Sequence, residues 1–411
     1  MARVRVTSAL AVLALVGAGS IVPARAAAPS DPGRSYHAVC PVPPRGNTAR
    51  CGAIVVTDAK GTPAVTTTPT GFSPAQLHSA YNLPTEAPVP QTIAIVVAYD
   101  WPTAKADLDK YNSTFGLPFF PSCSATVTTA CFQKVNQNGA ASPLPVTNAG
   151  WAQEAAIDVE TAHGICQNCK ILLVEANTAG FADLAAAART AAAMGANVIS
   201  NSYGGGDWVI DLSPYEAAYE HPGVAVVAAT GDKGYISSGA VFPASLPGTV
   251  AVGGTTLALN ADNSYKSETT WVGGGSGCSY KYAAQPWQTS LPNWAAVGCG
   301  TKHSTADVAA VGDPATGAAI YDSTPYDRKS GWFRFGGTSL ATPIIAGAYG
   351  LAANASAQPY PAAIAYANPS ALRDITTGAN SSTCAGRVIC QAGPGYDGPT
   401  GLGTPNGLGG F

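Results

Sequence analysis

Short apolar runs rich in β-branched residues recur along the chain from residue 71 onward. They cover Thr92–Ala98, Ile171–Ala176, Val198–Ser202, Val224–Ala229 and Thr249–Val252. Most of their positions are apolar, which is typical of parallel strands buried on both faces. Helical spacing appears between and after these runs, over Thr103–Phe115, Gly150–Gly164, Phe181–Met194 and Ser213–Glu220. The alternation predicts a doubly wound α/β fold, in which a mostly parallel sheet is flanked by helices.

The chain before residue 71 has a different pattern. Residues 1–26 combine Arg3 and Arg5 with an apolar run and the small-x-small string Ala24-Arg25-Ala26, which indicates a secretory signal peptide rather than a membrane anchor. Residues 27–70 are rich in proline and threonine and show little periodicity. We interpret them as an N-terminal extension, a candidate short propeptide, ahead of one domain over residues 71–411.

Ten cysteines are present, an even number that suits export and disulfide formation. Proximity along the chain predicts five pairs, Cys40/Cys51, Cys123/Cys131, Cys166/Cys169, Cys278/Cys299 and Cys384/Cys390. Connectivity stays open at this point, since spacing alone does not fix it. A zinc or redox site at Cys166 and Cys169 is the alternative, but the second Cys pair or His pair of a zinc site is absent.

Charged residues are sparse: they make up 11% of the chain, and the formal net charge is −3. Removal of the signal peptide would leave 18 basic and 24 acidic residues, a net charge of −6. The absence of a basic run argues against nucleic-acid binding. Sparse charge suits an acidic medium, because little repulsion builds up when carboxylates are protonated. We expect a secreted, extracellular monomer without membrane association once the signal is cleaved.

One string carries a strong chemical signal. In Phe335-Gly-Gly-Thr-Ser339-Leu-Ala-Thr-Pro343 a serine follows a glycine pair and precedes a helix of small apolar residues. The glycines let a substrate backbone approach, and the helix dipole favours negative charge near the serine. An isolated Gly-Thr-Ser is more often a helix cap. The whole string resembles the serine motif of the subtilisin and sedolisin superfamily, which implies that Ser339 is a nucleophile.

A nucleophilic serine needs a base, and histidine is the usual one in subtilisins. Among five histidines only His163 lies in a suggestive context. The His-Gly-Thr-His string of subtilisins is absent, and so is the Asp-Ser/Thr-Gly expected after the first strand. Asp100 follows that strand instead and is a candidate supporting residue.

Two carboxyls offer an alternative base. Glu154 and Asp158 are spaced i, i+4, so they share one face of the predicted helix among apolar neighbours. Two such carboxyls repel when both are ionised, so they should share a proton and one pKa should rise. A solvated acidic helix face is the plainer interpretation of the spacing alone. Glu160, nearby, is either an ordinary residue or a further member of the pair's network.

The Glu-x-x-x-Asp spacing resembles the sedolisins, or serine-carboxyl peptidases. This resemblance implies a subtilisin-like fold in which Glu154 is the base for Ser339 and Asp158 supports the glutamate. A third acid of that family follows a strand in a Gly-Asp-x-Gly string, and Asp232 fits this pattern. An aspartate in an oxyanion hole donates a hydrogen bond only when protonated, which predicts activity confined to low pH. A simple Asp-x-Gly turn is the alternative for this string.

The resemblance extends to a structural Ca²⁺ site in the Gly-rich tail. It implies side-chain oxygens from Asp374 and Asp397 and carbonyl oxygens from Ile375, Gly393 and Gly395. Hard cations prefer such ligands, and Gly-rich loops present carbonyls freely. The alternative is that the two aspartates only cap turns. We expect one structural calcium ion and no other cofactor.

The resemblance covers roughly residues 71–411, with one main departure. Sedolisins usually carry a large N-terminal prodomain, whereas only about 45 residues separate the predicted signal peptide from Gly71. The preferred hypothesis is a secreted serine-type endopeptidase that cleaves protein or peptide substrates at acidic pH. Two alternatives stay open: a non-catalytic secreted binding protein on a peptidase scaffold, and a neutral subtilisin-type peptidase that uses His163. The sequence indicates neither the subsite preference nor whether cleavage is internal or terminal.

Overall fold

The computed structural model describes Met1 and residues 34–42, 46–208, 211–384 and 386–411. The predicted signal peptide, Met1 apart, lies outside the described residues, so its assignment stays a prediction.

A central sheet of eight strands has the order β12-β11-β9-β7-β4-β6-β5, with β15 also paired to β11. Neighbouring strands are parallel except for β11 and β12. The bounds are β4 Thr92–Ala98, β5 Phe132–Asn136, β6 Lys170–Ala176, β7 Val198–Asn201, β9 Ala225–Ala229, β11 Val250–Leu259, β12 Tyr265–Thr270 and β15 Val308–Val311. All five predicted runs fall in these strands, so the predicted fold class is confirmed.

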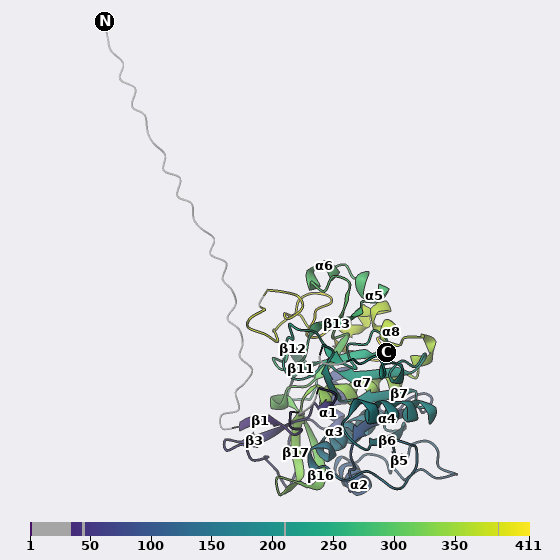
Figure 1. Ribbon diagram of the computed structural model, residues 1–411. Coiled ribbons are helices and arrows are strands. Elements are labelled where there is room, and N and C mark those ends of the chain that lie inside the picture. The colour runs from purple at the N-terminus through teal and green to yellow at the C-terminus, as the bar shows by residue number, and fades with distance from the viewer. Residues whose placement is uncertain (2–33, 43–45, 209–210, 385) are drawn as a thin grey trace.

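Helices flank this sheet (Figure 1). The longer ones are α1 Pro74–Tyr81, α2 Ala104–Phe115, α3 Ala149–Ile165, α4 Phe181–Ala193 and α7 Thr338–Ala352, and the short ones are α5 Pro286–Thr289, α6 Trp294–Val297 and α8 Ala362–Ala367. α3 and α7 pack against each other, α1 and α2 pack on α3, and α4 lies against β4 and β6. The helix predicted over Ser213–Glu220 is wrong. Only the 3-10 turn Glu216–Ala218 forms there, because Pro214 and Pro222 bracket the stretch and restrict helical backbone.

The segment before residue 71 contributes strands to two further sheets. The first has the antiparallel order β1-β3-β17-β16, with β1 Arg34–Ala38, β3 Ile54–Asp58, β16 Ala318–Tyr326 and β17 Lys329–Gly336. Its strands lie together at the lower left of Figure 1. The second has the order β10-β8-β2, with β2 Arg50–Cys51, β8 Tyr203–Gly206 and β10 Val241–Phe242. Two small pairs complete the strands, β13 Gly277–Ala283 with β14 Lys302–Thr305 and β18 Leu372–Arg373 with β19 Thr404–Pro405. The domain boundary at residue 71 stays a prediction.

Five disulfides join the cysteines that proximity paired, so that prediction is confirmed. Cys166 and Cys169 are therefore bonded to each other, and the described residues contain no free cysteine. Within the same residues, none of the helices has the length and apolarity to cross a bilayer.

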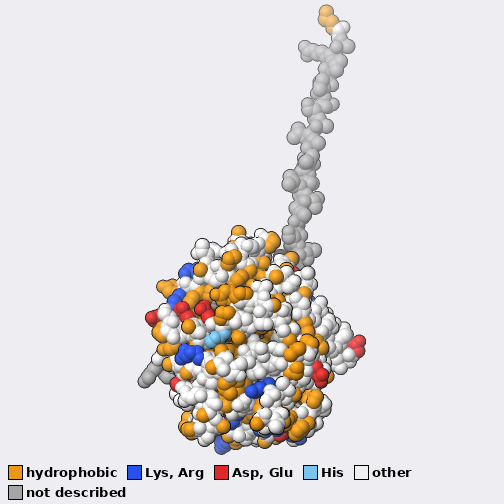
Figure 2. Space-filling view, turned by 90° about the vertical axis from the view of Figure 1, so that its right-hand side faces the viewer, with side chains coloured by type: hydrophobic (Ala, Val, Ile, Leu, Met, Phe, Trp, Pro, Cys, Tyr) orange, Lys and Arg blue, Asp and Glu red, His pale blue; other side chains and the backbone are white. Residues whose placement is uncertain are grey.

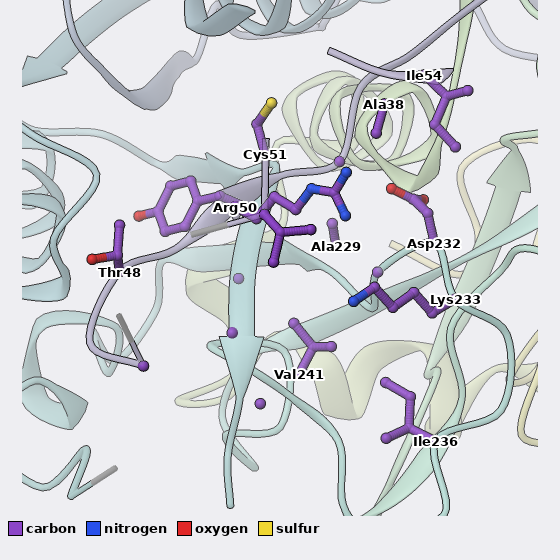
Figure 3. A pocket seen from close by; sticks show the side chains of 18 of the residues that line it. Ala38, Thr48, Arg50, Cys51, Ile54, Ala229, Asp232, Lys233, Ile236 and Val241 are labelled. Carbon is purple, nitrogen blue, oxygen red and sulfur yellow. The ribbon is translucent and has the colours of Figure 1, made fainter. Parts of the chain in front are cut away.

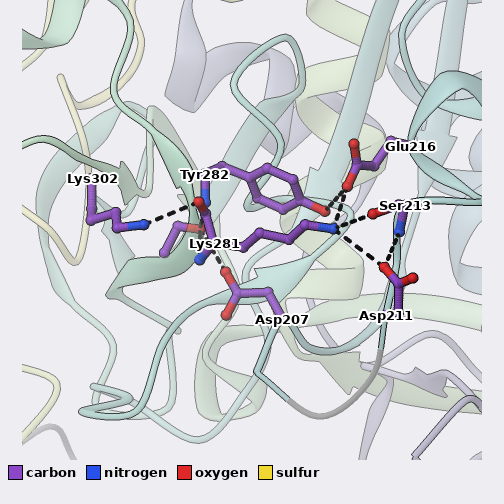
Figure 4. A network of polar contacts seen from close by, with 8 residues as sticks. Asp207, Asp211, Ser213, Glu216, Lys281, Tyr282 and Lys302 are labelled. Carbon is purple, nitrogen blue, oxygen red and sulfur yellow. Dashed lines mark hydrogen bonds and ion pairs between the residues drawn. The ribbon is translucent and has the colours of Figure 1, made fainter.

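Charged side chains are scattered thinly over the face shown in Figure 2. Where charged side chains cluster, their ion pairs and hydrogen bonds hold loops in place. Lys281 Nζ lies 2.6 Å from Glu216 Oε1 and 3.7 Å from Asp211 Oδ1 (Figure 4). Asp207, just beyond β8, accepts a hydrogen bond from Ser279 Oγ at 2.7 Å. These contacts hold the chain beyond β8 against β13.

Candidate active site

Ser339 lies in the first turn of α7, directly beyond β17. Gly337 joins the strand to the helix with a φ of +101°, in a region that residues with a Cβ rarely adopt. The Ser339 side chain is fully buried, and its hydroxyl donates to the Ser202 carbonyl at 3.1 Å. The helix N-terminus around Ser339 favours negative charge.

Glu154 lies on α3, the helix that packs against α7, and it is fully buried. Burial and the nearby Asp158 carboxyl raise the pKa of Glu154 well above its ordinary value, and hydrogen bonding to Ser339 lowers it in part. Oε2 accepts the backbone N–H of Ala53 at 2.8 Å. Oε1 accepts no hydrogen bond of normal geometry from the described residues, because the Ser339 hydroxyl points to Ser202.

Asp158 lies one helical turn from Glu154 and is also fully buried. Its Oδ1 accepts the Ser202 hydroxyl at 2.6 Å. Burial raises the pKa of Asp158 well above its ordinary value, and the Ser202 hydrogen bond lowers it in part. Burial and mutual interaction raise the pKa of both carboxyls, which is the direction expected from their spacing.

Asp232 follows β9, at the carboxyl end of the central sheet. Thr338 donates to its Oδ1 twice, from the backbone N–H at 2.6 Å and from the hydroxyl at 3.0 Å. Burial raises the pKa of Asp232 to about 6, against the Thr338 hydrogen bonds and the charge of Arg50, which lower it. Asp232 Oδ2 and Ser339 Oγ both lie 2.8 Å from the point where a Cβ on Gly52 would stand. The second carboxyl oxygen and the serine oxygen thus face one small volume.

A cavity of about 420 Å³ opens beside Asp232 (Figure 3). Residues Gly204–Gly206 of β8 form part of its wall, and the N-terminal residues Thr48, Arg50 and Ile54 form another part. The guanidinium of Arg50 points toward Asp232 in this view. The cavity lies next to Ser339 rather than over it, since Ser339 is not among the residues that line it.

The other candidates from the sequence lie elsewhere. His163 stands nine residues beyond Glu154, about 13 Å along the helix axis. Its ring centroid lies 3.9 Å from that of Phe120, and burial lowers its pKa to about 3. Glu160 accepts the Tyr321 backbone N–H at 2.9 Å, and its carboxyl neighbours are Asp107 and Asp322 rather than Asp158.

Asp100 is also separate from the serine. Its Oδ1 lies 2.6 Å from Lys134 Nζ, and the same ammonium lies 3.7 Å from Glu175. This ion pair stabilises the end of β6, and within the described residues it forms no hydrogen bond or ion pair with Glu154 or Asp158.

Four hydrogen bonds at the site, made by three residues, were not predicted from the sequence. They come from the Ser202 hydroxyl, the Thr338 amide and hydroxyl, and the Ala53 amide. Thr338 stands within the serine motif, so its position was a usable signal. Ala53 lies 101 residues before its partner Glu154 and belongs to the segment interpreted as an extension, where no local pattern marks a role.

The residues predicted to hold calcium lie in one group of loops. Gly395 N–H donates to Asp374 Oδ2 at 2.8 Å, and Gly393 N–H donates to Asp397 Oδ2 at 3.2 Å. Burial and the Asp374 charge raise the pKa of Asp397, which reaches about 8. The carbonyl oxygens of Ile375, Gly393 and Gly395 accept no hydrogen bond from the described residues.

This donor set fits a hard cation, because two carboxyls stand with backbone carbonyls that have no other partner. No group of three or more His, Cys, Asp or Glu side chains suited to a metal occurs in the described part of the chain. Backbone carbonyls would therefore supply most ligands of any ion here.

Comparison with known proteins places these features in a family. The sequence profile of the subtilase family matches residues 126–386. Kumamolisin from Bacillus sp. (strain MN-32) is 29% identical over 373 residues, which cover 83% of this chain and 63% of that protein. Sedolisin from Pseudomonas sp. (strain 101) is 27% identical over 368 residues, which cover 81% of this chain and 60% of that protein. The chain thus spans less than two thirds of the length of these two relatives.

A solved structure has the same fold. It is Pseudomonas sedolisin, a serine-carboxyl proteinase, in complex with two molecules of pseudo-iodotyrostatin. It superposes with a TM-score of 0.66 at 24% sequence identity, covering 82% of this chain and 96% of that one.

Proposed function

The chain belongs to the subtilase family, on its sedolisin branch, and from this premise we propose that it is a serine-carboxyl endopeptidase that cleaves peptide bonds at acidic pH. The observation that carries the proposal is the meeting of four residues from three segments. Ser339 begins α7, Glu154 and Asp158 lie on α3, and Asp232 follows β9. Nucleophile, base and oxyanion donor all have a candidate of the right chemistry within one site.

In the first step, Ser339 Oγ attacks the peptide carbonyl while Oε1 of Glu154 takes the serine proton. The glutamate suits this role because Oε1 has no other hydrogen-bond partner in the described residues. Before the attack the pair holds one proton, which lies on Asp158, so that Glu154 is ionised and can accept the proton of Ser339; Ser202 holds Asp158 in place. Glu154 then returns the proton to the leaving amine, as microscopic reversibility requires.

The tetrahedral intermediate carries a negative oxygen that needs a donor. Protonated Asp232 would supply an O–H from Oδ2, while Thr338 holds Oδ1 and so fixes the carboxyl's orientation. Because this carboxyl has a pKa of about 6, it carries the proton in acid and loses it near neutrality.

The remaining features support an exported enzyme. Five disulfides suit an oxidising compartment, and we propose that the chain is secreted as a monomer after its signal is cleaved. We also propose that Asp374, Asp397 and the carbonyls of Ile375, Gly393 and Gly395 bind one Ca²⁺. Such an ion would link the tail loops and contribute to stability, away from the reaction itself.

The test is hydrolysis of an internally quenched peptide mixture at about pH 4, with the products identified by mass. Ser339→Ala should reduce kcat/KM by at least about 10³-fold, because the covalent step is lost. Ser304→Ala is the matched control, since Ser304 is also a fully buried serine. Its hydroxyl has no hydrogen-bond partner in the described residues, so its removal should disturb little. Equal activity of wild type and Ser339→Ala would rule out the serine mechanism. Products released only from chain ends would indicate an exopeptidase.

A further inference from the structure

The cavity beside Asp232 begins next to the proposed nucleophile. Gly52 and Asp232 belong to its lining, and a Cβ on Gly52 would stand 2.8 Å from both Ser339 Oγ and Asp232 Oδ2. Its volume of about 420 Å³ lies in the range of protein pockets that bind ligands. A peptide whose carbonyl reaches Ser339 therefore has a neighbouring side chain within reach of this cavity.

Most of the cavity wall is apolar. Side chains of Ala229, Ile236 and Val241 form part of it, and the backbone of Gly204–Gly206 forms another part. In pockets of this kind apolar contacts bind the body of a ligand, while a few polar groups decide which ligand fits. The choice of substrate side chain therefore depends on the charged groups at the wall.

The charges at the wall are mainly positive in acid. Among the described residues that line the cavity, those that carry a charge or can titrate are Arg50, Tyr203, Asp232 and Lys233. Burial raises the pKa of Tyr203 well above its ordinary value, so its hydroxyl stays neutral. Asp232, with a pKa raised to about 6, is protonated and neutral below that pH. Arg50 and Lys233 then give the cavity a net positive charge.

Lys233 is the cation that lacks a partner. Arg50 Nε donates to the Cys40 carbonyl at 2.9 Å, whereas Lys233 forms no hydrogen bond or ion pair within the described residues. Lys233 follows Asp232 in the turn beyond β9, and its ammonium points into the cavity (Figure 3). The side chain is exposed, so its charge is open to an incoming anion.

We propose that Lys233 makes this cavity selective for an acidic side chain of the substrate, aspartate or glutamate, next to the bond that is cleaved. This inference rests on the proposed peptidase function. The methylene groups of a glutamate would pack on Val241 and Ile236, while its carboxylate would meet the Lys233 ammonium. A basic side chain would meet like charges, and a neutral one would gain the apolar contact alone.

The selectivity should be confined to a window of pH. A glutamate side chain is ionised above about pH 4.3. Asp232 is ionised only above about pH 6, where its charge repels an acidic substrate and its carboxyl no longer donates to the oxyanion. The next carboxyl, that of Asp207 just beyond β8, does not line the cavity and is bound to Ser279. The preference should therefore be greatest near about pH 5.

The experiment measures kcat/KM at about pH 5 for pairs of quenched peptides that differ only in one glutamate or glutamine. The pair is placed in turn at each position around the cleaved bond, and all peptides carry a C-terminal amide. Wild type should cleave the best-placed glutamate peptide about fivefold faster than its glutamine partner, as expected for an exposed ion pair. The ratio should approach one at about pH 3, where glutamate is protonated, and should shrink in about 1 M salt.

Variants of the lysine assign the effect. Lys233→Met removes the charge and keeps an unbranched chain, so the ratio should fall to about one. Lys233→Arg keeps the charge and should keep the ratio. Lys110→Met is the matched control, because Lys110 is an exposed lysine on α2 that does not line the cavity. This control should behave as wild type does. A second peptide set with free C-terminal carboxylates shows whether the chain end is bound instead.

Equal cleavage of every glutamate and glutamine pair by wild type would overturn the selectivity and leave the peptidase standing. A glutamate preference that persists in Lys233→Met would also overturn it, because another group would then select the side chain. A gain confined to the peptides with free carboxylates would overturn it in favour of binding at the chain end. Hydrolysis of none of the peptides would remove the peptidase and this inference together.

Discussion

Glu154 and Glu160 are both fully buried on α3, yet they face different neighbours. Glu154 lies beside Ser339 and Asp158, whereas Glu160 is bound to the Tyr321 amide and faces Asp322. Burial alone raises the pKa of both carboxyls, so a raised pKa does not distinguish a base from a structural acid. The distinction comes from Ser339, the proposed nucleophile, which lies beside Glu154 and not beside Glu160.

The two glutamates therefore make a matched pair of variants. Glu154→Gln should lower kcat/KM by about 10³-fold at about pH 4, because the amide cannot take the serine proton. Glu160→Gln removes an equally buried carboxyl and should stay within about tenfold of wild type. Steady-state kinetics on folded variants decide the matter. A large loss in Glu160→Gln alone would move the base to the second carboxyl group.

Asp232 should set the upper pH limit of activity. Its pKa is raised to about 6, so the carboxyl is protonated below that pH and can donate to the oxyanion. Above it, the ionised group repels the oxyanion and kcat/KM should fall about tenfold per pH unit. In Asp232→Asn the amide donates at every pH, so the decline near pH 6 should vanish from the kcat/KM profile. If the decline persists in that variant, another group causes it.

At the scale of elements, the site depends on the close approach of α3 and α7. The two helices meet where Gly347 of α7 faces Ile165 of α3, and a Cβ on Gly347 would lie 2.5 Å from Ile165 Cγ2 and 2.6 Å from Ile165 Cβ. The branched Cβ of isoleucine cannot move without the backbone, so the glycine sets the spacing between the helices. That spacing also fixes how far Glu154 lies from Ser339.

Gly347→Ala should push the helices apart and lower the free energy of unfolding by roughly 1–3 kcal/mol. Gly350→Ala, one turn further on, is a gentler control, because its Cβ would first meet the terminal Cδ1 of Ile93 at 2.8 Å, which can rotate away. Urea denaturation of both variants at one pH measures the difference. The prediction is wrong if Gly350→Ala costs as much as Gly347→Ala.

How far the elements could be predicted depended on how local their pattern is. β4 was placed to the residue, because a strand buried on both faces is a continuous apolar run. β2 has only two residues and β8 is mostly glycine, so neither carries a periodic signal. Glu154 and Asp158 were found together because i, i+4 spacing is local. The Ser202 hydroxyl on Asp158 comes from 44 residues away, and only the folded chain brings the two together.

The whole molecule buries more carboxyl groups than its proposed mechanism uses. Asp307 and Asp322 have pKa values raised to about 7, mainly by burial, and burial also raises the pKa of Glu160 well above its ordinary value. Each of these carboxyls therefore loses its proton at a higher pH in the folded state than in the unfolded chain. Sparse surface charge adds little repulsion in acid, so both features favour stability there.

Stability should accordingly decline as pH rises. These carboxyls contribute fully to the free energy of unfolding below about pH 4, where they are protonated in both the folded and the unfolded state. That contribution is lost as pH rises through about 7. A net shift of two pKa units at one carboxyl corresponds to about 3 kcal/mol. Urea denaturation at several pH values, with calcium held in excess, measures the slope, and Asp307→Asn should flatten it. A free energy of unfolding that rises toward neutral pH would contradict this account.

The stability gained from bound calcium should instead increase as pH rises. Binding requires ionised Asp397, whose pKa without an ion is about 8, so affinity should increase as pH rises. Chelation near neutral pH should lower the Tm by a few degrees, and the chelator should have no effect on Asp397→Asn. Asp262→Asn is the control, because Asp262 lies in an exposed turn, where its carboxyl accepts hydrogen bonds from Ser264. This variant should respond to the chelator as wild type does. An unchanged wild-type Tm on chelation would remove calcium from the proposal.

The pairing of β2 with β8 has a further consequence, for solubility. β8 pairs with β10 through Gly205 and Gly206 and with β2 through Tyr203 and Gly204. Were β2 absent, the backbone of Tyr203 and Gly204 would lose its strand partner and lie open to pair with another chain. β2 itself ends the sheet as a two-residue strand that carries Arg50, a short and charged edge that gives a second chain little to pair with. A form in which β2 cannot pair with β8 should therefore aggregate more readily at high concentration, which light scattering would measure.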